Sequence, residues 1–231
     1  MFSYRSAILL AVLVLPASAD TVAYSTFGPG DAYLTDSFHW QIASWESDAV
    51  PFTISESGSL TNLRVVAGQI QFGDPAPLTF TLRGGSTPDG AVLESWTLTT
   101  AMMPAAPAGR PYDAPLQIFT LSSVNSPVLE SGVTYWLRAD SSAMFGGFSW
   151  GSNSIGVTGF EYIYAGDPGG PAWRSTAADA PAPVFEVNVA PPSSVPERGG
   201  LGIVPVLLWG LVTLGRFAQA AAHVGGRAGL P

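Results

Sequence analysis

Short stretches in which apolar and polar residues alternate limit this chain to a fold built from β-strands. The clearest is 78–83, where every second side chain is apolar, and 133–138 and 185–189 repeat the pattern. Successive side chains of a strand point to opposite faces, so a period of two predicts strands with one buried face. In the second stretch, Val133, Tyr135 and Leu137 are expected to share that face.

Turn-forming sequences separate these stretches, and no segment of the body keeps a helical period. Clusters of glycine, proline, aspartate and serine, as at 84–86 and 88–90, mark turns, and the four prolines of 102–115 indicate a long loop. About nine short strands predict an all-β fold, an antiparallel β-sandwich of jelly-roll or Greek-key style. The other candidate strands are 51–55, 60–66, 92–99, 116–122, 145–150 and 157–164.

The N-terminus has the pattern of a secretory signal peptide. Arg5 precedes a run of apolar residues, 7–15, and Ala17 and Ala19 follow it with one residue between them. A charged section, a short apolar section and a small-x-small site are the parts of an export signal. We therefore expect residues 1–19 to form a signal helix that is cleaved on export.

A proline- and glycine-rich linker, 190–200, separates the body from a second apolar segment. Within this linker stand Val195, Pro196 and Glu197. A break of this composition favours a domain boundary. The expected domains are a signal peptide at 1–19, a β-sandwich at 20–189, the linker at 190–200, a hydrophobic anchor or sorting helix at 201–217, and an Ala/Gly-rich tail at 218–231.

The apolar segment itself, 201–215, carries no charge and is closed by Arg216. As a helix it would span about 22 Å, less than the roughly 30 Å hydrocarbon core of a bilayer. A buried C-terminal strand is therefore an alternative. The flanking arginine and the preceding break favour a short helix that meets a membrane.

The body is strongly acidic and contains no cysteine. Residues 20–192 hold sixteen acidic residues and five arginines, a formal charge of −11. Such a surface repels phosphate backbones, which excludes nucleic acid as a partner. Without disulfides, the apolar core alone must hold the exported domain together.

Two parts of the body and the C-terminal segment resemble a class of bacterial surface proteins. Residues 85–95 and 129–137 are similar to paired motifs of choice-of-anchor-type β-sandwich domains. The Val-Pro-Glu triplet at 195–197, followed by the apolar segment, resembles a PEP-CTERM sorting signal. Arg198 stands where that signal has a second proline, and its arginine cluster is reduced to Arg216, so the signal is degenerate.

The resemblance implies a cellular role and no reaction. Such proteins are exported by Gram-negative bacteria that make extracellular polysaccharide. An exosortase-type membrane protease recognises them and releases them to the cell surface or matrix. The resemblance therefore implies the secretion machinery and this protease as partners, with extracellular polysaccharide as a further candidate.

Residues suited to catalysis are few. His39 is the only histidine of the body, which leaves no usual His/Cys zinc site and one possible base for a serine triad. Glu94, Glu130 and Glu161 are candidate glycosidase carboxylates, although a solvated strand face explains each of them. We therefore expect no enzymatic activity and no catalytic residue.

Binding is the more open class of function. Flat aromatic rings stack on sugars, and Trp173 lies in loop-like sequence, where ligand contacts concentrate. Trp136 follows Tyr135 in one strand, so one of the two must look away from the core or into a second layer. The other tryptophans of the body are expected to fill the core.

No cofactor is expected, with calcium as the one candidate. Asp31, Asp36 and Asp167 offer oxygen ligands in turn-like sequence, but no EF-hand spacing is present and Asx turns explain the same residues.

Together these patterns predict a non-enzymatic exported protein of the cell surface or extracellular matrix. We expect it to be processed or anchored through its C-terminal segment, with transient anchoring in the inner membrane. A secreted carbohydrate-binding module and a glycan-active enzyme are the alternatives.

The export signal makes a direct prediction. Cleavage after Ala19 should leave a mature chain that begins at Asp20, because residues 17–19 present the small side chains that signal cleavage needs. Mass spectrometry of the protein from envelope and medium fractions measures this terminus. An intact Met1 in both fractions would contradict the prediction.

Overall fold

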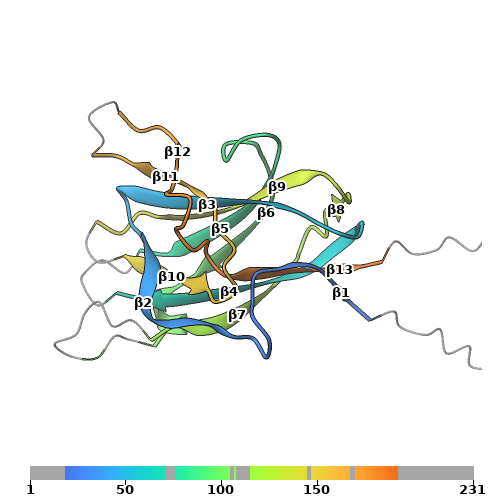
Figure 1. The fold of residues 1–231 in the computed structure, drawn as a ribbon, viewed down its shortest axis with the longest axis horizontal. Helices are drawn as coiled ribbons and strands as arrows, with labels where there is room; N and C mark the ends of the chain where they lie inside the picture. Colours follow the sequence, from blue (N-terminus) through green and yellow to red (C-terminus); the bar gives the residue numbers. More distant parts are fainter. Residues whose placement is uncertain are drawn as a thin grey trace, which may run out of the picture. The chain divides into compact units, whose positions relative to one another are not determined.

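The computed structural model describes residues 19–70, 76–104, 107, 115–144, 147–166 and 170–191. Over this part, the chain forms thirteen β-strands and one short 3-10 turn, η1 (Thr100–Met102), and no α-helix (Figure 1). The strands form two sheets, in which the paired strands run antiparallel. The all-β, antiparallel fold class predicted from the sequence is confirmed.

The first sheet has seven strands and is organised around the long strand β4. Its order is β1-β13-β4-β10-β2, and β7 and β8 also pair with β4. Strand β4 is long enough for β13 to pair with it up to Val65 and for β10 to pair from Ala67 onward. The strands are β1 (Thr21–Ser25), β2 (Tyr33–Ile42), β4 (Gly58–Gln69), β7 (Gln117–Ser122), β8 (Val128–Leu129), β10 (Phe148–Asn153) and β13 (Phe185–Ala190).

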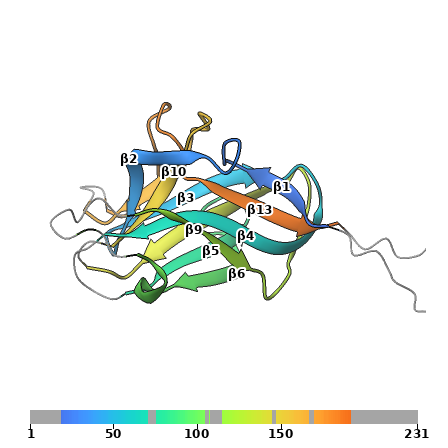
Figure 2. The same cartoon turned by 90° about the horizontal axis from the view of Figure 1, so that it is seen from below.

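The second sheet has six strands in the order β12-β11-β3-β9-β5-β6. The chain passes between the sheets many times, for example from β3 to β4 and from β4 to β5. Figure 1 shows the two sheets as layers, with the second sheet above the first, and in Figure 2 they overlie each other. The strands are β3 (Glu46–Thr53), β5 (Leu78–Gly84), β6 (Ala91–Leu98), β9 (Thr134–Ser141), β11 (Glu161–Tyr164) and β12 (Arg174–Ser175).

Alternate residues of the two sheets face each other and form one apolar core. In β5, Leu78, Phe80 and Leu82 are at most 2% exposed, as the alternation predicts. The ring of Phe80 meets that of Trp150, from β10 of the other sheet, edge to face at 5.1 Å. Aromatic side chains therefore join the two layers where a disulfide is not available.

Each of the nine predicted strands overlaps an observed one, but one side chain was placed on the wrong face. Val133 precedes β9 and is 40% exposed. Its N–H donates to the carbonyl of Glu130 in a turn in which Gly132 takes φ +79°, so the strand begins only at Thr134. Four observed strands, β1, β2, β8 and β12, have no counterpart among the nine, and β8 and β12 are too short, at two residues each, to show a period.

The first and last strands of the body pair with each other. Thr21 stands opposite Val189, so the described chain enters and leaves the fold at the same place. In Figures 1 and 2 this place lies at the right, whereas β2 and β10 lie towards the left.

The predicted signal helix, the linker motif at Val195, Pro196 and Glu197, the helix at 201–217 and Arg216 lie outside the described residues. Within the described part, no helix has the length and apolar character that crossing a membrane requires.

Two neighbouring residues of β6 test the assignment of faces. Leu98 is fully buried, and Thr97 is exposed on the opposite face. Leu98→Asp should unfold the domain, because a charge in the apolar layer costs several kcal/mol against a typical stability of about 5–15 kcal/mol. Thr97→Asp, the matched control, should leave thermal denaturation within a few degrees of wild type. Circular dichroism follows the thermal denaturation of both variants. Equal melting temperatures would contradict the assignment of the two faces of β6.

Candidate functional site

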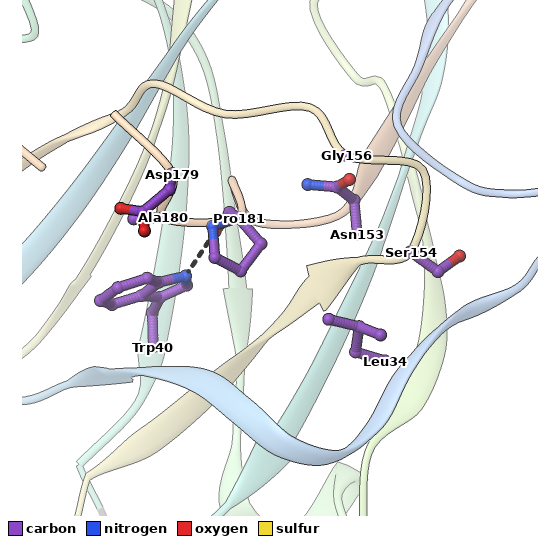
Figure 3. A pocket seen from close by; sticks show the side chains of 8 residues that line it. All are labelled: Leu34, Trp40, Asn153, Ser154, Gly156, Asp179, Ala180 and Pro181. Atoms are coloured by element: carbon purple, nitrogen blue, oxygen red, sulfur yellow. Dashed lines mark hydrogen bonds between the residues drawn. The ribbon is translucent and has the colours of Figure 1, made fainter. Parts of the chain in front are cut away.

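Two adjoining hollows lie where the two sheets end side by side. The larger, about 490 Å³, is lined by Leu34, Trp40, Asn153, Ser154, Gly156 and residues 179–181 (Figure 3). The smaller, about 290 Å³, is lined by Trp40, Glu46, Tyr162, Ala180 and residues 175–177. Because Trp40 and Ala180 line both, the two hollows adjoin, and we call them together the Trp40 cleft.

The position of Trp40 follows from the register of the first sheet. It stands opposite Trp150 across the β2–β10 pair, so both rings lie on the face that carries the core. Trp150 is fully buried, whereas Trp40 belongs to the last strand of the sheet and is only half-buried. A core-facing aromatic side chain on an edge strand therefore becomes the wall of a cleft.

Two contacts fix the Trp40 ring. Its indole N–H donates to the carbonyl of Pro181 at 2.9 Å, which Figure 3 shows as a dashed line. Its ring also meets the buried Phe160 edge to face at 4.4 Å between centroids. Since the polar edge is satisfied within the protein, the remaining ring surface is apolar and rigidly held.

The rim of the larger hollow is held by Asn153. Its side-chain amide donates to the carbonyls of Val157 and Ala182, and its oxygen accepts from the N–H groups of Ile155 and Val157. These bonds tie the turn after β10 to the segment before β13. The wall of the cleft is thus preformed.

A carboxyl group lines each hollow. Glu46 is half-buried, and burial raises its pKa. Asp179, in the larger hollow, is exposed. Among the described residues, none donates a hydrogen bond to either side chain. Each hollow therefore offers an acceptor that the described protein leaves unused.

Asp48 lies two residues beyond Glu46 in β3 and points to the same, core-facing side, where it stands opposite Tyr162. It is fully buried, and neither carboxyl oxygen has a hydrogen-bond partner in the described structure. Burial, and then the charges of Glu46 and Asp140, raise its pKa well above the usual range. The group is thus driven towards its neutral form.

Trp173 lies outside the cleft, on the outer face of the second sheet. Its ring covers the guanidinium of Arg138, 5.0 Å away, and its N–H donates to Asp89 at 2.8 Å. Arg138 in turn pairs with Asp140 and Asp89 at 2.7 Å. The predicted stacking residue is therefore engaged with the protein itself.

Trp136 shares that outer face yet is only 5% exposed. It stands between Pro51 and Arg83 of the neighbouring strands, and its indole N–H has no partner among the described residues. Tyr135, on the opposite face, is buried as well. Trp136 is thus covered rather than presented as a platform.

Of the three calcium candidates, the structure describes the side chain of Asp31. Asp31 adopts φ +63° and pairs with Arg64 through two bonds of 2.6 and 3.0 Å, while Arg64 also contacts Glu186. The side chain of Asp36, and Asp167 as a whole, lie outside the described part. Within that part, no group of three or more possible metal ligands is found.

The three candidate glycosidase carboxylates lie in different elements, Glu94 in β6, Glu130 directly after β8 and Glu161 in β11. Glu94 is 3% exposed, so the expectation of a solvated strand face is wrong. Its carboxylate accepts bonds from Ser123, Val124 and Asn125 and closes the turn after β7. Glu130 is exposed, and Glu161 is half-buried in β11 with a pKa raised by burial.

The residues of the Trp40 cleft are missing from the sequence-based candidates. Glu46, Tyr162 and the segment 175–181 come from different strands and loops, and only the meeting of the two sheet edges assembles them. The one signal for the cleft is an aromatic residue that stays half-buried on an edge strand. Recognising that signal requires knowledge of the strand order. In comparisons with known proteins, the chain matches no family model and no curated sequence.

Asp48 makes a pH-dependent prediction. Folding raises the pKa of this carboxyl group. Below the pKa that the group has in the unfolded chain, it leaves the free energy of unfolding unchanged. As the pH rises from there towards the pKa of the folded protein, the free energy of unfolding falls by up to about 1.4 kcal/mol per pH unit. Asp48→Asn should therefore raise the melting temperature progressively above about pH 4, by roughly 2–4 °C per kcal/mol in a domain of this size.

The control is the pH series itself. Below about pH 3.8, Asp48 is protonated in both states, so any remaining difference between the proteins reports the amide substitution alone. A difference in melting temperature that does not change between pH 3 and pH 8 would contradict the assignment.

Proposed function

We propose that this chain is a non-enzymatic exported protein of the cell surface or extracellular matrix, processed or anchored through its C-terminal hydrophobic segment. One observation supports this most directly. β1 begins at Thr21, directly after the expected signal cleavage site, and β13 ends at Ala190, where the linker starts. Removing either apolar end would leave every described strand pairing in place.

The finer assignments follow from the resemblance of the sequence. We propose a jelly-roll or Greek-key sandwich of the choice-of-anchor type, followed by a degenerate PEP-CTERM signal at 195–216. Secretion machinery and an exosortase-type protease are the proposed partners. The proposed location is the outer envelope or matrix, after transient anchoring in the inner membrane.

A glycan-active enzyme is the alternative, and the half-buried Glu46 is the observation in its favour. Glycosidases generally place two carboxyl groups about 5–9.5 Å apart across one bond. In the described structure, a single carboxyl group lines each hollow, Glu46 in one and Asp179 in the other. Neither hollow by itself holds such a pair, and we therefore propose binding without turnover.

The tail provides the test. Leu208→Arg places a charge in the middle of the apolar segment, which costs roughly 2.5–3.5 kcal/mol on insertion scales. The variant should shift from the membrane fraction to the soluble fraction. Leu230→Arg, outside the apolar segment, is the matched control and should not.

Mass spectrometry of the same fractions reads the processing step. Wild type should occur first on membranes with its tail and later in the matrix without it, cleaved near the Val-Pro-Glu triplet. Arg198→Pro should increase the cleaved share, because it restores the proline of the signal. If wild type is soluble and keeps its tail, the surface-anchor proposal fails.

A further inference from the structure

We infer that the Trp40 cleft binds a neutral saccharide chain. The inference rests on the proposed function only in requiring export, through which the protein would meet polysaccharide. It assigns a ligand class to a cleft of the described domain, independent of how the tail is processed.

The shape and lining of the cleft indicate a ligand with an apolar face and polar edges. The larger hollow, about 490 Å³, lies within the roughly 300–1,000 Å³ usual for small-ligand sites, and the smaller, about 290 Å³, lies just below that range. Trp40 lies between them, and Tyr162 adds a second aromatic wall to the smaller one. The C–H groups of a pyranose ring form a flat apolar face that packs on an indole, while its hydroxyls point outwards at the edges.

The polar groups define the ligand as a hydrogen-bond donor. The Glu46 and Asp179 carboxyl groups receive no hydrogen bond from the described residues, and ionised carboxylates only accept. Ser175 also lines the smaller hollow. Sugar hydroxyls donate to such acceptors and can also accept from a serine hydroxyl.

Charge decides against acidic polysaccharides. No arginine lines either hollow, and the body carries sixteen acidic residues against five arginines. Uronic acids or sulfated sugars would meet the carboxyl groups of Glu46 and Asp179, and Arg174, which stands opposite Tyr162 in β12, is not among the residues that line the hollows. A neutral chain is the saccharide class that fits.

The position of the cleft suits a tethered protein. Both ends of the body leave the fold where β1 and β13 pair, while β2, which carries Trp40, lies towards the other end (Figures 1 and 2). A body held through its C-terminus would therefore present the cleft away from its point of attachment.

The test measures binding by tryptophan fluorescence. Full-length protein in a phosphocholine detergent, which has no sugar headgroup, is titrated with maltohexaose, cellohexaose and mannohexaose. An alginate hexasaccharide and a hexalysine peptide serve as anionic and cationic comparisons. At least one neutral hexasaccharide should bind, and the anionic one should not.

Three variants locate the site. Trp40→Ala and Glu46→Gln should each weaken binding about tenfold or more, since both remove contacts at the centre of the cleft. Trp173→Ala is the matched control, a half-buried tryptophan on the outer face of the other sheet, and should bind as wild type does. If Trp40→Ala fails to fold, Glu46→Gln decides, because it keeps the side-chain shape.

Several results would overturn the inference. They are binding of none of the neutral sugars, binding of alginate or hexalysine alone, and binding that is lost in Trp173→Ala but kept in Trp40→Ala. If wild type shortened the hexasaccharides, the cleft would be the site of an enzyme rather than of a binding protein. None of these results bears on membrane fractionation, so failure of the cleft and failure of the anchor proposal remain distinguishable.

Discussion

Trp150 stands where the two sheets meet, and its surroundings show what holds this fold together. Its ring contacts Phe80 of the opposite sheet, and its buried N–H donates to the carbonyl of Val184 at 3.1 Å, just before β13 begins. An indole buried this deeply is stabilising only if its donor is satisfied, so the start of the last strand is fixed by the same residue that joins the layers. In a chain without cysteine, contacts of this kind stand in place of disulfide cross-links.

The same packing explains why the cleft forms where it does. Each sheet ends in a strand that has a neighbour on one side only, β2 in the first and β12 beside β11 in the second. Core-facing residues at these edges, Trp40 and Tyr162, lack a complete layer opposite them and stay half-buried. A sandwich whose edge side chains are aromatic thus acquires an apolar cleft without a dedicated loop.

Asp48 is the residue that agrees least with the requirements of the fold. A buried carboxyl without a partner lowers stability, and replacing it with asparagine should be favourable at neutral pH. Residues that are unfavourable for folding concentrate at functional sites. Asp48 lies two residues from Glu46 on the same face of β3, and Glu46 lines the cleft. The outer face shows the opposite case, since the charges of Arg138, Asp140 and Asp89 are paired with one another and capped by Trp173.

The sequence by itself determined the fold class, because a period of two is a local property that each strand carries independently. It located nine strands and assigned a buried face to three of them, failing at Val133, where a glycine turn delays the strand. It did not determine the order of the strands, because pairing depends on which surfaces bury the most apolar area together. Trp40, Glu46 and Tyr162 are brought together only by that order, whereas Trp173, which looked free in the sequence, is engaged by Arg138 and Asp89 from distant strands and loops. The tertiary structure alone decided which aromatic ring faces a cleft, since exposure is set by neighbours that are remote in the chain.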